Sequence, residues 1–194
     1  MRVALSIVVL LASCESGGDD PPDGGFFYRD AAGSSDGGQV KQDKVLVDYV
    51  FDGDTVRLNA GPDAPLTPDG KPLKDEVVRL LGVDAPEIEH APTPADCWGP
   101  ESAAAARELL LGREVTLEYD TSHGFRDSTD SHRLLAYVLI KTSNKNANGE
   151  LIRLGHACSY RRFQHRLIDQ FNGFEGDAES ARSGQWGSCT DPCP

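Results

Sequence analysis

The sequence lacks any excess of positive charge. Its 194 residues include 31 acidic and 19 basic side chains, which give a net charge of −12. Proteins that grip nucleic acid over a broad face do so with basic surface, so the composition argues against that class. It does not argue against a small, focused site. No internal repeat is evident, and the length fits one soluble globular domain with a sizeable core.

A long hydrophobic run is also missing from the start of the chain. The apolar stretch from Val3 to Ala12 follows a basic start and is too short to span a membrane as a stable helix. It is typical of a signal peptide. The residues Leu11-Ala12-Ser13-Cys14 resemble the lipobox of bacterial lipoproteins, in which the cysteine becomes the lipidated N-terminus. The alternative is an ordinary cleaved signal in which Cys14 is incidental. Either interpretation predicts export, as a membrane-anchored lipoprotein or a secreted protein.

Residues 15–44 have few apolar side chains and many Gly, Ser, Asp and Pro, with a net charge of −4. Such a stretch cannot bury enough surface to offset its ordering entropy, so we expect a flexible acidic tether. The remaining residues 45–194 carry a net charge of −9 and form the predicted folded domain. The predicted organisation is therefore a signal peptide over 1–14, a tether over 15–44 and one domain over 45–194.

Within the domain, alternating and continuous apolar runs predict five strands, and helical spacing with Pro and Gly boundaries predicts about three helices. The expected strands begin near Val45, Thr55, Val78, Glu114 and Arg133. The expected helices cover about 100–111, 149–154 and 169–183.

Carboxylates gather at the ends of two of these strands. Asp54 follows an Asp-Gly turn, and Asp84 and Glu87 stand beside Pro86, which we expect to end a single strand that also carries Arg79. Oxygen ligands suit a hard cation, and arginine grips phosphate through two parallel hydrogen bonds. Clustered carboxylates repel one another when no cation is bound, so we expect at least one of them to hold its proton more tightly than usual.

Each of these residues also has a plainer interpretation. Asp52 and Asp54 alone would be turn residues, and their spacing does not match an EF-hand loop. Arg79 and Arg133 would ordinarily form surface ion pairs. Their place inside apolar strands makes that interpretation weaker, because burying an unpaired guanidinium is costly. The five histidines show no mutual metal-ligand spacing, and His132 is expected in an exposed loop.

Several motifs in order carry a family resemblance: D-G-D-T at 52–55, R-L-L-G-V-D-A-P-E at 79–87, C-W-G-P-E at 97–101, R-L-L-A-Y at 133–137 and G-Q-W-G-S-C at 184–189. Together they resemble the thermonuclease, or staphylococcal-nuclease-like, family over roughly residues 44–189. Several motifs in the family's order are far more specific than any one of them. The resemblance implies an α+β fold, a five-stranded OB-type β-barrel with about three helices.

The resemblance also implies an activity: a calcium-dependent phosphodiesterase that hydrolyses DNA or RNA, acting as a monomer. Asp54, Asp84 and the backbone carbonyl of Ala85 would hold Ca²⁺. Glu87 would activate the attacking water, and Arg79 and Arg133 would stabilise charge on the phosphoryl oxygens. Two alternatives stay open: a catalytically inactive OB-type module that binds single strands, and a structural envelope lipoprotein with a decayed site.

Four cysteines remain once Cys14 is set aside. In an exported chain they favour disulfides, with three possible connectivities, against a zinc site that would use Cys158, Cys189 and Cys193. Members of the resembled family also carry a cysteine just before the helix. That likeness implies a Cys97–Cys189 bond and leaves Cys158 and Cys193 to each other.

One further stretch falls where the family places nucleotide-contacting tyrosines. Here the chain has Arg161 and Arg162, flanked by Tyr160 and Phe163. Aromatic stacking with bases is therefore a possibility at this position.

Overall fold

The computed structural model describes residues 41–122 and 124–193. The predicted signal peptide, Cys14 and most of the predicted tether lie outside these residues. Within the described part of the chain, no helix has the length and apolar character needed to cross a bilayer.

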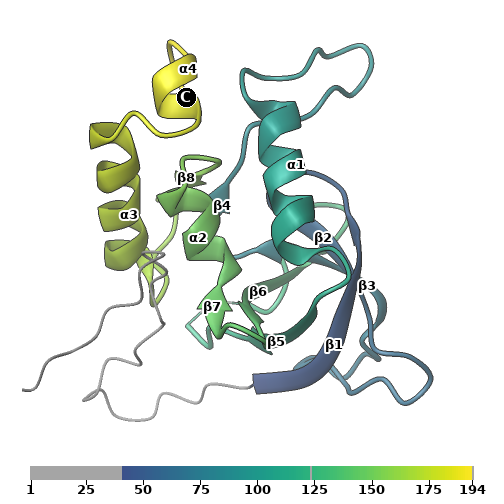
Figure 1. Ribbon diagram of the computed structural model, residues 1–194. Coiled ribbons are helices and arrows are strands. Elements are labelled where there is room, and N and C mark those ends of the chain that lie inside the picture. Colours follow the sequence, from purple (N-terminus) through teal and green to yellow (C-terminus); the bar gives the residue numbers. More distant parts are fainter. Residues whose placement is uncertain (1–40, 123, 194) are drawn as a thin grey trace, which may run out of the picture.

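Five strands close into a barrel (Figure 1). Their order is β3-β2-β1-β5-β6, and a parallel pairing of β3 with β6 joins the two ends of the sheet. All other pairings in the barrel are antiparallel. The predicted five-stranded α+β barrel of the OB type is confirmed. The barrel strands are β1 (Lys41–Val50), β2 (Thr55–Asn59), β3 (Lys74–Leu80), β5 (Glu114–Glu118) and β6 (Leu134–Ile140).

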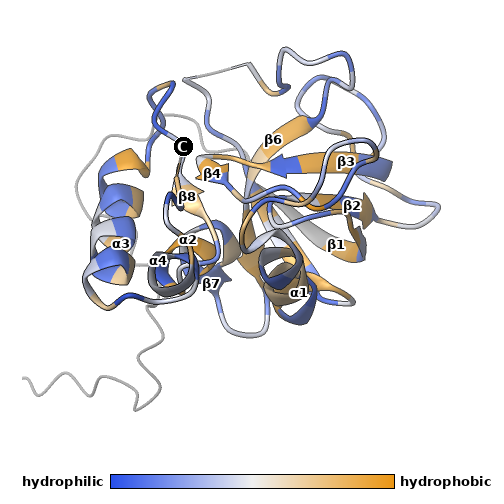
Figure 2. Cartoon of the chain, turned by 90° about the horizontal axis from the view of Figure 1, so that it is seen from above, coloured by the Kyte–Doolittle hydropathy of each residue, from blue (hydrophilic) through white to orange (hydrophobic). Residues whose placement is uncertain are grey.

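The barrel interior follows from the apolar pattern of the strands. Alternate residues of β1 and β2 point inward, whereas β6 is buried along nearly its whole length because the helices cover its outer side. Figure 2 shows orange, hydrophobic colour on the barrel strands and more hydrophilic colour on α3 (Ile168–Ser180). The fully buried strand residues include Val45, Val47, Val56, Leu58, Val78, Leu117, Leu134 and Val138.

Three main helices lie together on one side of the barrel (Figure 1). The middle one, α2 (Ala147–Arg153), contacts α1 (Gly99–Leu110), α3 and strand β6. These helices lie within a few residues of the predicted ranges. A short fourth helix, α4 (Gln185–Ser188), was not predicted. Two-residue strand β7 (Lys145–Asn146) extends the sheet beyond β6.

Strand β1 begins earlier than the sequence pattern indicated. It includes residues 41–44, which we had assigned to the tether. The extension pairs with the end of β5, where Lys41 lies opposite Glu118 and Gln42 opposite Leu117. The backbone of these residues therefore continues strand β1.

The expectation of one strand running to Ala85 was wrong. Strand β3 ends at Leu80, and Gly82 has a φ of +77°, a conformation that favours glycine and turns the chain. A separate strand β4 (Val83–Asp84) then pairs with β8 (Cys158–Ser159). The buried side chain of Asn148 fixes the turn, because its Nδ2 donates to the carbonyl of Leu81 at 3.0 Å.

Two disulfides join the four cysteines of the domain. Cys97 bonds Cys189, with Cα atoms 5.9 Å apart, and Cys158 bonds Cys193, with Cα atoms 6.0 Å apart. The predicted pairing is confirmed. The alternative zinc site is not formed, because Cys189 lies in the other disulfide.

Candidate phosphate-directed site at the barrel rim

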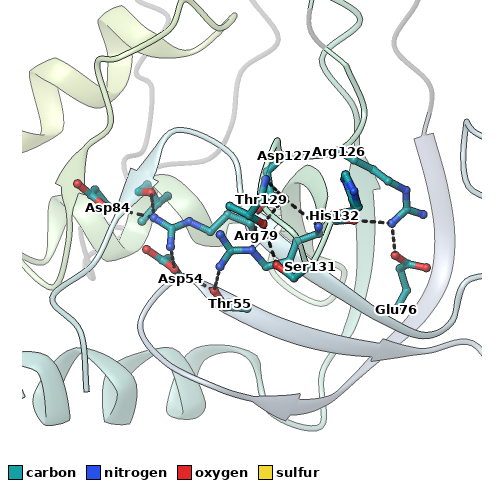
Figure 3. A network of polar contacts seen from close by, with 12 residues as sticks. Asp54, Thr55, Glu76, Arg79, Asp84, Arg126, Asp127, Thr129, Ser131 and His132 are labelled. Carbon is teal, nitrogen blue, oxygen red and sulfur yellow. Dashed lines mark hydrogen bonds and ion pairs between the residues drawn. The ribbon is translucent and has the colours of Figure 1, made fainter. Parts of the chain in front are cut away.

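The carboxylate of Asp54 is the buried centre of the site (Figure 3). Its side chain is only 2% exposed, and it follows the Asp-Gly turn between β1 and β2. Its Oδ1 accepts from Arg79 Nη1 at 2.6 Å and from the Thr55 hydroxyl at 3.0 Å. Its Oδ2 accepts from the backbone N–H of Ala85 at 2.9 Å. Three segments of the chain thus meet on one carboxylate.

Arg79 joins the two predicted acidic strand ends. Besides Asp54, its guanidinium donates from Nη2 to the Asp84 carboxylate at 3.2 Å and to the Val83 carbonyl at 3.1 Å. The expectation that Asp54 and Asp84 lie at one rim is therefore met. Asp84 is about half exposed, with a side-chain exposure of 53%, so this end of the pair faces solvent.

Arg133 reaches the same centre from the entry of β6. Its Nη1 donates to the Thr55 hydroxyl at 3.3 Å, and Thr55 in turn donates to Asp54. Asp127 holds the other side of the guanidinium, with its Oδ2 accepting from Arg133 Nε at 2.7 Å. The two predicted arginines thus converge on one Thr-Asp pair, Arg79 from β3 and Arg133 from the position just before β6.

The loop that carries Asp127 is fastened to the barrel by Arg126. Arg126 Nε donates to Asp69 at 2.6 Å, and its Nη1 donates to Glu76 at 2.5 Å and to the backbone carbonyl of His132 at 2.9 Å. His132 itself is exposed, as expected, and its carbonyl serves this contact. The loop 60–73, strand β3 and the segment before β6 are therefore tied together at one side chain.

Glu87 lies just beyond the Arg79–Asp84 contact and is largely exposed. Its backbone N–H donates to the Asp96 carboxylate at 3.1 Å, and its carbonyl accepts from the N–H of Asp96. The charges of Asp52 and Arg79 are close enough to move the pKa of the Glu87 side chain. Burial and Asp52 raise that pKa, while Arg79 lowers it, and the net direction is upward.

The proton affinity of Asp54 is also raised. Burial raises its pKa to about 7, although the guanidinium of Arg79 and the N–H of Ala85 oppose the shift. We expected one of the clustered carboxylates to have a raised pKa, and that carboxylate is Asp54. Burial is the largest cause of the shift, and repulsion from Asp52 adds to it.

The acids at the rim fit a hard cation by their chemistry. Asp54 and Asp84 are oxygen donors that already hold one positive group, the Arg79 guanidinium, between them. Within the described residues, a tight cluster of three potential metal ligands forms only at Cys158, Glu175 and Cys193, two of which share a disulfide. A cation at Asp54 and Asp84 would therefore compete with Arg79 for the same carboxylate oxygens.

A cleft of about 560 Å³ is lined by Arg79, Asp84 and Arg133 of this site. Four arginines and two aspartates line it, so the cleft is locally basic although the domain is acidic. The predicted aromatic stretch also borders it, where the rings of Tyr160 and Phe163 lie 5.2 Å apart and Arg162 lies over Tyr160. Arg161 instead pairs with Glu175 and contacts Asn172. The lining arginines are Arg79, Arg126, Arg133 and Arg162.

Sequence reasoning missed Asp127 and the Arg126 contacts. Asp127 lies in a polar loop, where Asp is a common turn residue. Its Oδ1 does make such a turn, accepting from the Thr129 hydroxyl at 2.7 Å, and the same oxygen accepts from the backbone N–H of Arg133. An Asp-x-Thr turn six residues before an arginine was the one signal in the sequence that could have indicated this role.

Fold and site together define a class of protein. OB-type barrels commonly bind oligonucleotides or oligosaccharides, and an arginine-rich rim with carboxylates indicates a phosphate ligand. The sequence model of the family described as "Staphylococcal nuclease homologue" matches residues 77–188, more than half of the chain. The chain therefore belongs to the staphylococcal nuclease homologue family.

Curated relatives agree with this assignment. The chain is 35% identical over 100 residues to a thermonuclease of Staphylococcus intermedius, a match that covers 51% of this chain and 50% of that protein. It is 28% identical over 151 residues to endonuclease YncB of Bacillus subtilis, covering 76% of this chain and 64% of the relative. A protein of Methanocaldococcus jannaschii without a described function is 30% identical over 155 residues, covering 71% and 68%. The chain thus spans about half to two thirds of these relatives.

The Arg126–Asp69 contact predicts how stability depends on pH. Hydrogen bonds from Arg126 and then from Thr67 lower the pKa of Asp69 to about 2, below its ordinary value of 3.8. The unfolded chain therefore binds a proton first as pH falls, so this contribution is complete above about pH 5 and is lost between about pH 4 and 2. We expect Asp69→Asn to lower the melting temperature near neutral pH and to differ less from the unmodified protein near pH 2.

The measurement is thermal unfolding across that pH range. Asp63→Asn, at an exposed aspartate of the same loop, controls for the loss of one negative charge. A stability difference for Asp69→Asn that stays constant down to pH 2 would mean that the Asp69 carboxylate does not stabilise the loop through its charge.

Proposed function

We propose that this chain is a calcium-dependent nuclease that hydrolyses DNA or RNA outside the cytoplasm, acting as a monomer. The single observation that carries the proposal is the chain of contacts Arg79–Asp54–Thr55–Arg133 at the rim of a basic cleft. It stands in a domain of the staphylococcal nuclease homologue family. The names of two relatives, a thermonuclease and an endonuclease, support the same reaction class.

The cleft supports a phosphodiester substrate. Nucleic acid is a polyanion, and the four arginines of the cleft lining outnumber its two aspartates, which favours an anionic ligand. Three of the four lining arginines are held by carboxylates of neighbouring segments, so their guanidinium groups have fixed positions. We expect cleavage that does not depend on sequence, because arginines that contact phosphate do not read base edges.

Each rim residue has a role in the proposed reaction. Arg79 and Arg133 stabilise charge on the phosphoryl oxygens as the bond breaks, and Glu87 orients the attacking water and takes its proton. Burial and the charge of Asp52 raise the pKa of Glu87 above its ordinary value, which is the direction expected for a general base. Asp54 and Asp84, with the carbonyl of Ala85, would hold Ca²⁺. When bound, the ion supplies a Lewis acid that polarises the scissile phosphate.

One observation favours a second candidate, a barrel that binds single strands without cutting them. The rings of Tyr160 and Phe163 border the cleft, and aromatic side chains can stack on the bases of a single strand without any cleavage chemistry. Degradation of plasmid DNA and of RNA by the purified domain, with calcium against chelator, separates the two candidates. Strand binding with no cleavage in either condition would favour the binding module.

Asp84→Asn and Glu87→Gln separate metal binding from water activation. Calcium binds the folded state alone, so it should raise the melting temperature of the unmodified domain. Asp84→Asn should abolish both that rise and cleavage, because it removes one of two carboxylates that would share the ion. Glu87→Gln should keep most of the rise and lose turnover. Thermal melts with and without calcium, beside a cleavage assay, provide the measurement. A calcium shift that survives Asp84→Asn would place the ion elsewhere.

Arg133→Lys tests the role of the guanidinium fork. Lysine keeps the charge and can still meet Asp127, but it loses the planar geometry that now reaches Asp127 and Thr55 together. Turnover should fall on the order of a hundredfold or more, while the melting temperature changes little. Steady-state kinetics and a thermal melt of the same sample suffice. Comparable losses in both would indicate that Arg133 is a structural ion-pair partner of Asp127.

We also propose that the chain is exported and lipidated at Cys14. The two disulfides support an oxidising compartment, and the N-terminal sequence resembles a lipoprotein signal. Cys14→Ser should move the protein from the membrane fraction to the soluble exported fraction. Mass spectrometry of the mature N-terminus makes the test direct: an unmodified residue other than Cys14 at that end would contradict the lipid anchor.

A further inference from the structure

Both disulfides connect the C-terminal tail, residues 185–193, to segments that carry rim acids. Cys193 bonds Cys158 of β8, and Cys158 lies directly opposite Asp84 in the β4–β8 pair. Cys189 bonds Cys97, the residue next to Asp96. The tail therefore reaches the segments of both Asp84 and Glu87, from the side of the barrel where α4 and the C-terminus lie (Figure 1).

On its inner side the Asp84 segment is held by Arg79, which contacts Asp84 and the Val83 carbonyl, and by the bond from Ala85 N–H to Asp54. Strands β4 and β8 are two residues long, and isolated two-stranded ribbons are marginal in water. The backbone N–H of Tyr160 adds one bond to the Gly82 carbonyl at 3.0 Å. The tail holds β8 through two contacts at Cys158. One is the Cys158–Cys193 bond, and the other is the buried Gln185, whose Nε2 lies 3.2 Å from Cys158 Sγ.

The Glu87 segment is coupled to Cys97 through its neighbour. Asp96 and Glu87 exchange two hydrogen bonds, from Asp96 N to the Glu87 carbonyl at 3.0 Å and from Glu87 N to Asp96 Oδ2 at 3.1 Å. Gly99, at the start of α1, packs so closely that a Cβ there would come within 2.1 Å of the Glu87 carbonyl. A shift of the chain at Cys97 would therefore displace the Glu87 backbone.

The two disulfides are the covalent attachments of a tail that has little secondary structure of its own. Helix α4 has only four residues, and short helices are marginal on their own. Its backbone is tied to the domain by the bond from Gln185 N to the Gly155 carbonyl at 2.9 Å. Beyond Cys189, the chain to Cys193 has no helix or strand. Loss of either disulfide would leave one rim segment without its outer attachment.

We propose that the C-terminal tail, residues 185–193, positions the rim acids in a redox-dependent way and call it the clamp. Its two halves are the two disulfides, which act independently. The Cys158–Cys193 bond positions Asp84, and the Cys97–Cys189 bond positions Glu87. Opening each bond takes two electrons and two protons from a dithiol, which is itself oxidised to a disulfide. The domain would therefore reach its working rim geometry only in an oxidising compartment. The consequence for catalysis rests on the proposed nuclease function, whereas the effect on the two segments does not.

The test compares two paired variants, Cys158→Ser/Cys193→Ser and Cys97→Ser/Cys189→Ser, in calcium-free buffer. Amide hydrogen exchange gives the direct readout. The first pair should speed exchange at the amides of Ala85 and Tyr160, and the second at that of Glu87, each by about tenfold or more. Dithiothreitol on the unmodified domain should speed exchange at all three. Val115→Ala, which shortens a buried side chain in β5 on the barrel wall, is the control for general destabilisation.

Function provides the second readout. The Cys158/Cys193 pair should weaken calcium affinity, measured by calorimetry, by roughly ten- to a hundredfold. The Cys97/Cys189 pair should reduce turnover by a similar factor and leave calcium affinity nearly unchanged. A variant that is only less stable would change neither quantity at a temperature well below its melting point, as Val115→Ala should show.

Two outcomes would overturn the clamp. One is unchanged exchange at Ala85, Glu87 and Tyr160 in both paired variants, whatever their activity. The other is faster exchange spread evenly over the barrel, as in Val115→Ala, with no separation between the two halves. If the unmodified domain neither binds calcium nor cuts nucleic acid while the exchange pattern separates as expected, the nuclease function fails and the positioning role of the tail stands.

Discussion

The buried carboxylate of Asp54 is the constraint on which the rest of the rim depends. An ionised carboxylate is very costly to bury unless it is paired and hydrogen-bonded. With 2% of its side chain exposed, Asp54 meets this requirement through donors from Thr55, Arg79 and Ala85. These donors come from β2, β3 and the segment after β4. The end of β3, the turn before β2 and the acidic segment cannot move independently without leaving this charge unpaired.

Parallel pairing of β3 with β6 brings the second arginine to the same carboxylate. In this register Val78 lies opposite Leu134. Arg79 follows Val78 and Arg133 precedes Leu134, so the two arginines lie close together on adjacent segments. Thr55 lies opposite Arg79 in the β2–β3 pair. Its hydroxyl donates to Asp54 and accepts from Arg133, so it links the two side chains. Barrel closure therefore determines the site, because an open sheet would leave β6 and Arg133 away from β2.

Local patterns of apolar and turn residues predicted the strands, and the family resemblance carried by the ordered motifs implied the barrel and the residues of the rim. The sequence did not predict contacts that depend on how loops meet. Asp127 and Arg126 each find their partners through a loop, and apart from the Asp-x-Thr turn at Asp127 their neighbours resemble those of ordinary surface residues. The break after β3 has a similar origin. A run of Leu, Gly and Val suits a continuous strand, but Gly82 at a φ of +77° turns the chain so that Asp84 can pair beside Cys158.

The acidic composition and the basic cleft are compatible for a physical reason. A free arginine side chain samples many rotamers, and ordering it on a ligand costs conformational entropy. Arg79, Arg126 and Arg133 are each held by carboxylates, so this cost is met during folding. The same carboxylates lower the net positive charge of the cleft, which weakens general attraction to a polyanion. A surface of this kind loses affinity over a broad face and keeps fixed donors at one place, so under the proposed function a phosphate would be recognised only inside the cleft.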